Sequence, residues 1–444
     1  MPEPTPNRRA LLRGLTGLGL AALAGPALAA CGRADATPVT SGRVDLRLWT
    51  HDPGYIATFE TAVTDDTLVG DSAYRFGLNV TSAAPPDIVT RMITQAVADG
   101  NTPDLAGVVI DQFPRVMGSG IAEHLFTDLT ETVAPFDGEL LKLAPYSVAG
   151  KPYGLDSDNS ISVLYYREDL FAEHRVPESV ATWEELAEHG ERLARDHDIS
   201  LGMVATGDNG SVVNGFLQLL LQRGGAAFDA TGELALESDE ALEVLEFMAA
   251  GVRSGYLIAL PDPYGSACAA ALKSGRLAAT VMPNWYNAYG LQANVPEQAG
   301  RWRMRTLPRF AGGGHLASTM GGTGFTVLKD KANSQAALEL LTRVYLTREG
   351  QLLRYHSGGF LPTLSGLYQD PELLAVEDAY LGGQRVFDVY APAAADLPTF
   401  YQAPGMQILT DVLGGPVLDA LKGRTSPDAA LEAGVRAYRQ QVKR

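Results

Sequence analysis

Short runs with the character of strands alternate with short helical segments along most of this sequence. Residues 44–49 alternate between apolar and polar side chains, which is typical of a strand with one buried face. Residues 88–98 carry apolar side chains at helical spacing, and residues 105–110 form the next buried strand. Because helices that connect neighbouring strands pack against the faces of the sheet, this pattern predicts an α/β fold with largely parallel sheets.

Length and charge narrow the class of protein further. A chain of 444 residues is too long for one compact core, so we expect two domains. The formal net charge of −17 argues against nucleic acid or an anionic membrane surface as a partner, because both attract basic surfaces. The same charge makes copies of the chain repel one another, and we expect a monomer.

The N-terminal residues have the pattern of an export signal rather than of a folded element. Paired arginines at Arg8 and Arg9 precede an apolar stretch that runs to Ala30, and small residues stand directly before Cys31. This order fits a signal peptide over residues 1–30, similar to a twin-arginine signal, that ends in the lipobox of bacterial lipoproteins; the general export route stays open. We therefore expect lipidation of Cys31, a linker over residues 31–43 and a location on the extracytoplasmic face of the cell membrane.

No set of residues typical of covalent or metal catalysis stands out. The sequence has no Gly-x-Ser-x-Gly motif, and its seven histidines form no metal-binding spacing. The glycine runs at 312–314 and 321–324 lack the Lys-Ser/Thr pair of a phosphate-binding loop. We predict a protein that is not an enzyme and holds no cofactor or metal. An exported glycoside hydrolase stays open, because an acidic chain offers many pairs of carboxylates.

The segment 150–170, GKPYGLDSDNSISVLYYREDL, places polar side chains between a turn and a strand. Asp156, Asp158 and Asn159 precede the run of residues 161–166, which predicts a strand. Two interpretations remain at this point: solvated acids in an ordinary loop, or acids that face a ligand.

Aromatic residues recur beside acids or amides at the ends of predicted strands. The apolar face of a sugar ring stacks on aromatic side chains, and its hydroxyl groups bond to carboxylates and amides. A buried polar group adds selectivity, because leaving it unpaired is costly. The pattern therefore favours a neutral carbohydrate as ligand. The groups are Trp49 with His51 and Asp52, Asp111 with Phe113, Asp156, Asp158 and Asn159 before Tyr165 and Tyr166, Trp285 and Tyr286 with Asn284 and Asn287, and Phe400 and Tyr401 with Gln402.

Five segments in this order resemble a known family. They are VDLRLWTHDPG, GNTPDLAGVVIDQF, GKPYGLDSDNSISVLYYREDLF followed by ATWEEL, LKSGRLAATVMPNWYNAY, and MGGTGFTVLKDKANSQAALELLTRVYLTREGQ. The chain resembles the extracellular solute-binding proteins of family 1, the sugar-binding lipoproteins of bacterial ABC importers, to which the maltose-binding protein belongs. The resemblance covers nearly the whole chain after Cys31.

The resemblance implies a two-lobe periplasmic-binding-protein-like fold of type II, with the ligand in a cleft between lobes joined by crossover segments. Lobe 1 would comprise residues 44–149 and 283–346, and lobe 2 residues 150–282 and 347–444. The protein would deliver a carbohydrate to ABC permease subunits; a polyamine or a glycerol phosphodiester is the alternative ligand. The family's ligand positions correspond here to Trp49, His51, Asp52, Asp111, Asp156, Asp158, Asn159, Trp285, Tyr286, Gly321, Gly322, Thr323, Phe400 and Tyr401.

Around Asn214 and Phe216 members of that family often supply a further contact. Here the sequence shows no clear acid or aromatic pair at this place. The segment therefore adds no residue to the predicted ligand positions.

Overall fold

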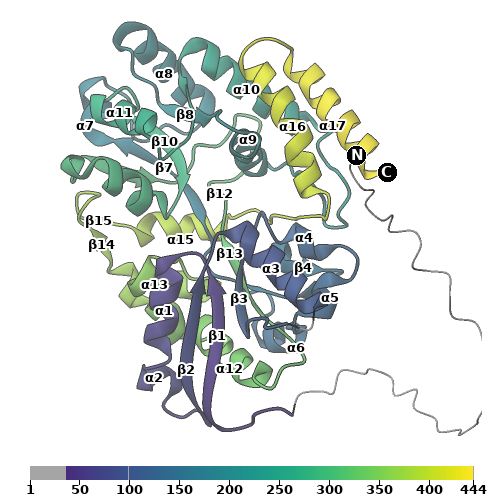
Figure 1. The fold of residues 1–444 in the computed structure, drawn as a ribbon. Helices are drawn as coiled ribbons and strands as arrows, with labels where there is room; N and C mark the ends of the chain where they lie inside the picture. The colour runs from purple at the N-terminus through teal and green to yellow at the C-terminus, as the bar shows by residue number, and fades with distance from the viewer. Residues whose placement is uncertain (1–36, 99, 444) are drawn as a thin grey trace, which may run out of the picture. The chain divides into compact units, whose positions relative to one another are not determined.

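The computed structural model describes residues 37–98 and 100–443 (Figure 1). The predicted signal peptide and Cys31 lie outside these residues. The predicted linker over residues 31–43 is too long at its C-terminal end, because the chain joins the fold earlier. The backbone N–H of Val39 donates to the carbonyl oxygen of Ala332 over 2.8 Å, and strand β1 (Gly42–Thr50) begins at Gly42.

The first sheet has the strand order β2-β1-β3-β13-β6. Strand β1 pairs in parallel with β2 (Tyr74–Ser82) and with β3 (Leu105–Val109), and Figure 1 shows β1 and β2 side by side. Strand β13 (Thr323–Val327), from far along the chain, is antiparallel to β3, and β6 (Leu155–Asp156) is antiparallel to β13. The sheet is therefore mixed, and a late segment of the chain completes an early sheet.

Helices cover both faces of this sheet, and the side chains of β1 alternate between them. Leu46 and Leu48 pack with α1 (Pro53–Ala62) and α12 (Ser334–Tyr345), whereas Trp49 packs with α3 (Pro85–Val97). Helix α13 (Arg348–Gly358) packs against α1 and α12. The shorter elements of this lobe are α2 (Asp66–Val69), α4 (Pro114–Met117), α5 (Ile121–Leu125), α6 (Thr130–Val133), η1 (Ala134–Phe136), η2 (Ala144–Tyr146), β4 (Ser147–Val148) and β5 (Lys151–Pro152).

The second sheet is built around β7 (Ile161–Arg167), whose side chains are all buried. Strands β10 (Ala279–Pro283), β11 (Trp302–Arg305) and β12 (Ser318–Thr319) are each antiparallel to β7. Strands β8 (Gly202–Ala205) and β9 (Leu257–Leu260) form a parallel pair, which a bridge between Ser200 and Leu277 joins to the start of β10. The expectation of largely parallel sheets is thus wrong for this lobe, because its central strand receives antiparallel partners on both sides.

Most of the long helices pack in this second lobe. Helix α9 (Asn209–Arg223) contacts α10 (Asp239–Ser254) and α16 (Met406–Leu421), and α16 packs against α17 (Pro427–Val442), as Figure 1 shows. The other elements are α7 (Glu168–Glu173), α8 (Trp183–His197), α11 (Ser266–Ser274), η3 (Asn287–Gln292), η4 (Pro296–Gln298), η5 (Ser365–Gln369), α14 (Pro371–Leu374), β14 (Glu377–Asp378), β15 (Gln384–Arg385) and α15 (Phe387–Ala395).

Three segments of the described chain cross between the two lobes, and we call them the crossing segments. Residues 157–160 connect β6 to β7, residues 320–322 connect β12 to β13, and residues 359–364 lead from α13 to η5. Hydrogen bonds tie the first two together: Ser157 N donates to Thr323 O over 2.8 Å. The Asn159 side chain donates to Pro362 O and so reaches the third.

The predicted lobe boundaries at residues 283 and 347 are wrong. Residues 302–305 were placed in lobe 1, but β11 pairs with β7 of the second sheet, so the chain returns to the first lobe only after β12. Residues 348–358 were placed in lobe 2, but α13 packs on α1 and α12. Strand pairing and helix packing between distant segments set these boundaries, and local sequence patterns do not carry that information.

None of the helices within residues 37–98 and 100–443 combines the length and the apolar character that crossing a lipid bilayer requires.

Candidate functional site

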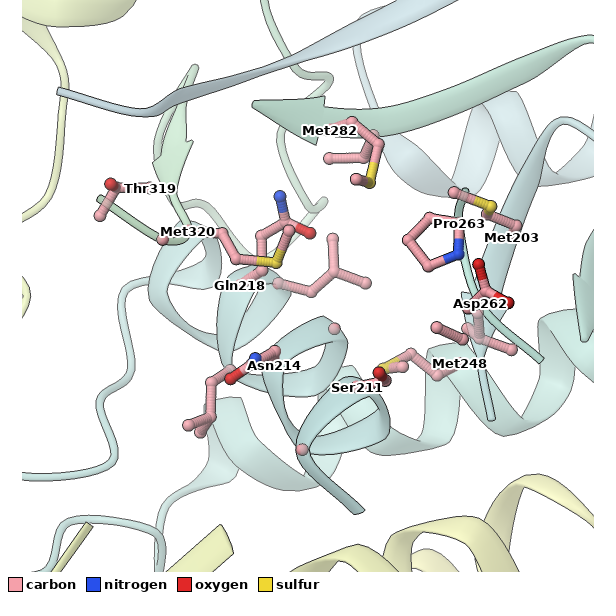
Figure 2. A pocket seen from close by; sticks show the side chains of 18 of the residues that line it. Met203, Ser211, Asn214, Gln218, Met248, Asp262, Pro263, Met282, Thr319 and Met320 are labelled. Carbon is pink, nitrogen blue, oxygen red and sulfur yellow. The ribbon is translucent and has the colours of Figure 1, made fainter. Parts of the chain in front are cut away.

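A cavity of about 630 Å³ opens beside the second sheet, and Figure 2 shows it from close by. Most of its wall comes from the second lobe: β8, the N-terminal half of α9, α10, β10 and the start of α16. The first lobe contributes residues 109–111, at the carboxyl end of β3. A volume of this size is typical of sites for small molecules, and the cavity is therefore the candidate binding site.

Helix α9 presents a row of polar side chains to the cavity. Ser211, Asn214 and Gln218 are spaced by three and four residues, so they lie on one face of the helix (Figure 2). Asp208 caps the helix and accepts from Ser211 N over 2.8 Å. Gln218 donates to Ser162 Oγ of β7 over 2.7 Å. Asn214 makes no hydrogen bond with the described residues and is exposed, so its amide is available to a ligand.

Methionine side chains form much of the remaining wall. Five of the nine methionines of the chain line the cavity, and each comes from a different segment of the second lobe or of its crossings. Figure 2 shows four of them around the cavity together with Pro263. The five are Met203 in β8, Met248 in α10, Met282 in β10, Met320 in a crossing segment and Met406 in α16.

Aromatic side chains lie at the edge of the cavity. The half-buried ring of Trp285 stacks against Tyr264, with ring centroids 6.0 Å apart and an angle of 30° between the planes. Tyr264 is 42% exposed, so the pair offers a free aromatic surface. Phe400 lines the cavity as well. These rings provide the flat apolar surface on which a ligand can stack.

Asp111 is the acid that the first lobe contributes. It follows β3, and burial raises the pKa of its carboxyl, against the opposing effects of Gln112 and of His51. Burial lowers the pKa of the His51 imidazole. The Asp111 carboxylate is exposed to the cavity and can accept a hydrogen bond from a ligand.

Four predicted ligand residues line the cavity: Asp111, Trp285, Gly321 and Phe400. The structure thus brings together segments that lie nearly three hundred residues apart in the sequence. This is possible because the chain crosses between the two lobes several times. The other predicted residues do not line the cavity, and they fall into two groups.

The first group lies at the crossing segments and is bonded within the protein. The Asp158 carboxylate accepts from Leu361 N over 3.0 Å and from Asn284 Nδ2 over 3.2 Å. Asp156 lies 3.8 Å from Lys142 Nζ, and both side chains are almost fully buried. Asn159 donates to Tyr368 Oη over 2.9 Å. Asp158 and the Asn159 N–H groups thus have hydrogen-bond partners in the protein, Asp156 has Lys142 as an ion-pair partner, and none of the three residues lines the cavity.

Gly322 and Thr323 belong to the same region. Gly322 has φ of +113°, and a Cβ there would lie 2.6 Å from Lys142 Nζ. The position therefore requires glycine for both its conformation and its space. Thr323 is buried at the start of β13, and its carbonyl oxygen accepts from Ser157 N.

The second group surrounds the cavity without reaching it. Trp49 is buried in the core of the first lobe, and Asp52 caps α1 by accepting from Gly54 N over 2.7 Å. His51 packs edge-on against Tyr55. Tyr286 is fully buried and donates to Pro263 O over 2.9 Å. Tyr401 is half-buried beside Phe400.

The sequence interpretation missed the methionines that line the cavity and the polar face of α9, and near Asn214 it recognised no acid or aromatic pair. The spacing of Ser211, Asn214 and Gln218 on an otherwise apolar helix was a usable signal. The methionines gave no such signal in the sequence, because only the tertiary fold brings their segments together around the cavity. Within residues 37–98 and 100–443 no group of three His, Cys, Asp or Glu side chains has the geometry to hold a metal ion.

The model of a protein family matches residues 55–379, and its description is bacterial extracellular solute-binding protein. The chain belongs to this family. The predicted family is therefore confirmed, and the two-lobe fold agrees with it.

Curated relatives of this solute-binding protein carry names of sugar-binding proteins. The arabinooligosaccharide-binding protein of Halalkalibacterium halodurans is 26% identical over 78% of this chain and 78% of its own. The arabinooligosaccharide-binding protein of Bacillus subtilis is 24% identical over 90% of this chain and 93% of its own. The lactose-binding protein of Rhizobium radiobacter is 25% identical over 80% and 83%.

Solved structures share the fold. The sugar-binding protein MalE of Xanthomonas citri superposes with a TM-score of 0.73 at 16% identity, over 90% of this chain and 98% of its own. The binding protein of B. animalis subsp. lactis in complex with β-1,6-galactobiose superposes with a TM-score of 0.68 at 19% identity, over 90% and 96%. At these identities the likeness establishes the fold of this solute-binding protein.

Proposed function

We propose that this chain is the substrate-binding protein of an ABC importer and that it binds a carbohydrate in the cavity beside the second sheet. The observation that carries this proposal is the composition of the cavity rim. A stacked aromatic pair, Trp285 and Tyr264, stands near side chains with free hydrogen-bonding capacity, Asp111 and Asn214. Rings for the apolar face and carboxylate or amide groups for the hydroxyls are what a sugar requires.

Three further acids line the cavity wall, and each accepts a hydrogen bond within the protein. Asp208 accepts from the backbone and hydroxyl of Ser211. Asp262 accepts from Tyr264 N over 2.8 Å, and Asp411 accepts from Gln407 Nε2 over 2.9 Å. These bonds leave the carboxylates negatively charged, so a polyamine stays the alternative ligand that the binding screen has to test.

The names of the relatives define the first ligands to test. Arabino-oligosaccharides and lactose should raise the melting temperature of the purified protein, because a ligand that binds only the folded state stabilises it. A polyamine such as spermidine serves as the competitor of different charge. Stabilisation by spermidine with no response to any saccharide would contradict the proposal.

The same samples decide between binding and hydrolysis. Chromatography of the saccharide after prolonged incubation should recover it unchanged. Appearance of shorter saccharides would instead establish an exported glycoside hydrolase.

We also propose that Cys31 is lipidated and anchors the protein on the outer face of the cell membrane, from which it supplies the permease. The motif before Cys31 supports this proposal. Replacing Cys31 by Ser should release the protein from the membrane fraction into the soluble fraction and abolish labelling by radioactive palmitate. Retention of Cys31→Ser in the membrane fraction would contradict the anchor.

A further inference from the structure

The inner part of the cavity differs in chemistry from its rim. Met248 and Met282 are 1% and 4% exposed, and both nevertheless line the cavity, so the small surface they retain faces inward. Met203 and Met320 are half-buried and complete this surface, and Figure 2 shows all four around the same space. We call these four residues the methionine wall.

Gln218, Asp262 and Ser211, the polar side chains near the methionine wall, each make a hydrogen bond within the protein. Gln218 donates to Ser162 Oγ, and Asp262 accepts from the backbone of the loop that it begins. Ser211 donates its hydroxyl to Asp208 over 2.7 Å. The inner part of the cavity offers mainly apolar surface, made of thioether and aliphatic groups together with the buried rings of Trp183 and Tyr256.

This surface suits a ligand part other than a sugar ring. Sugar hydroxyls buried against thioethers would lose their hydrogen bonds to water, because a thioether sulfur is only a weak acceptor. Methionine side chains also offer no flat face for stacking; they adapt their shape to irregular apolar groups instead.

We propose that the ligand is a glycoside with an apolar aglycone, whose sugar occupies the rim and whose aryl or alkyl group fills the compartment behind the methionine wall. This inference rests on the proposed carbohydrate function and narrows its substrate class. The wall residues are then specificity-determining residues: they select the aglycone, while Asp111, Asn214 and Trp285 hold the sugar.

Matched pairs of ligands test the inference. The saccharide that gives the largest thermal shift in the first screen is compared by titration calorimetry with its own p-nitrophenyl and n-hexyl glycosides, in both anomers. At least one glycoside should bind tenfold or more tightly than the free saccharide, because burying several apolar carbons against the methionine wall removes them from water. p-Nitrophenol alone serves as the control for non-specific uptake.

Substitutions in the methionine wall test whether the preference for the glycoside arises there. Met282→Gln and Met203→Gln should reduce the preference for the glycoside to less than threefold while the affinity for the free saccharide stays within twofold. Met203→Leu should keep the preference, because it preserves the apolar surface. Met117→Gln is the matched control: Met117 is 9% exposed in the core of the first lobe and does not line the cavity.

Failure of the inference and failure of the proposed function give different results. Equal affinities for the free saccharide and both glycosides would overturn the inference and leave carbohydrate binding intact. A preference that persists unchanged in Met282→Gln and Met203→Gln would also overturn it. Absence of binding by every saccharide and glycoside would overturn the proposed function itself.

Discussion

Two groups of carboxylates in this protein stand at similar places in the sequence and have different surroundings. Asp156 and Asp158 precede β7, and Asp111 follows β3; all three come within a few residues of a buried strand. Asp156 and Asp158 have partners within the protein: Lys142 and Asn284 from neighbouring segments, and the backbone of Leu361 from a crossing segment. No crossing segment covers Asp111, and it faces the cavity. An acid at the end of a strand is thus available to a ligand only where no other segment of the chain packs over it.

This difference assigns separate tasks to the two regions. At the crossing, charges are neutralised inside the protein, so substitutions there should change stability. At the rim, the Asp111 carboxylate is open to the cavity, so substitutions there should change the affinity for the proposed ligand. The four predictions that follow test this separation, beginning with the largest effect.

Replacing Asp158 by Ala should lower the free energy of unfolding by about 3–5 kcal/mol, because it removes the acceptor of two buried donors. The backbone N–H of Leu361 and the side-chain amide of Asn284 would then lack their hydrogen-bond acceptor. Urea unfolding followed by circular dichroism measures the loss. Asp111→Ala should change the unfolding free energy by less than about 0.5 kcal/mol, because Asp111 is at the surface of the cavity. Similar losses in both variants would contradict the separation.

The stability of the crossing should depend on pH through Asp156. Burial raises the pKa of its carboxyl to about 7, from 3.8. The folded state therefore holds a proton that the unfolded state releases, so this stabilising contribution is complete below pH 3.8 and is lost as the pH rises to about 7. Asp156→Asn, which cannot ionise, should become more stable relative to the wild type by on the order of 3 kcal/mol across this range.

Urea midpoints at several pH values measure this change as a difference between variant and wild type. The matched control is Asp128→Asn. A hydrogen bond from Thr130 lowers the pKa of Asp128 to about 2, so its contribution changes only in more acidic solution. A constant difference between Asp156→Asn and the wild type from pH 4 to pH 8 would show that Lys142 keeps Asp156 ionised throughout.

At the rim, Trp285→Ala should weaken saccharide binding by at least tenfold, because truncating an aromatic anchor typically costs about 2 kcal/mol or more. The thermal shift produced by the best saccharide should disappear, with little change in the melting temperature of the free protein. Phe76→Ala is the matched control, since Phe76 is a half-buried aromatic residue on β2 that does not line the cavity. An undiminished shift in Trp285→Ala would place the sugar elsewhere.

The smallest effect is expected for Asp111→Asn. A hydrogen bond to a charged acceptor exceeds one to a neutral acceptor by on the order of 1 kcal/mol, so the affinity should fall about fivefold. Titration calorimetry at neutral pH measures this decrease in affinity. Asp87→Asn, at an exposed acid in α3 outside the cavity, should bind as the wild type does. Equal affinity in Asp111→Asn would exclude Asp111 from contact with the ligand.

Elements with local signals were predicted well. Ser238 before a helical run and Gly255 after it are local signals for the start and end of a helix, and α10 has both, with Gly255 in the left-handed conformation. Thr182 caps α8 by accepting from Glu185 N over 3.2 Å, as the capping box predicts. Caps depend on a few neighbouring residues, so the sequence contains the whole signal.

Where distant packing competes with a local signal, the prediction from sequence was wrong. Gly414, Gly415 and Pro416 predict a break between two helices, over residues 406–413 and 417–421. They form one helix, α16, which continues through Pro416. It packs against α17 and α9, and at Gly414 the side chain of Asn209 fits closely against the backbone. Packing on both sides stabilises a helix that the local sequence would interrupt.

By itself, then, the sequence determined the order of most strands and helices, the family, and the aromatic and acidic character of the binding site, because periodicity, caps and motif order are properties of neighbouring residues. Only the tertiary structure decided that β11 belongs to the second sheet, that Asp156 and Asp158 are enclosed while Asp111 is open, and that methionines from five segments meet around one cavity. Each of these depends on segments far apart in the chain, whose pairing and packing arise only when the whole chain folds.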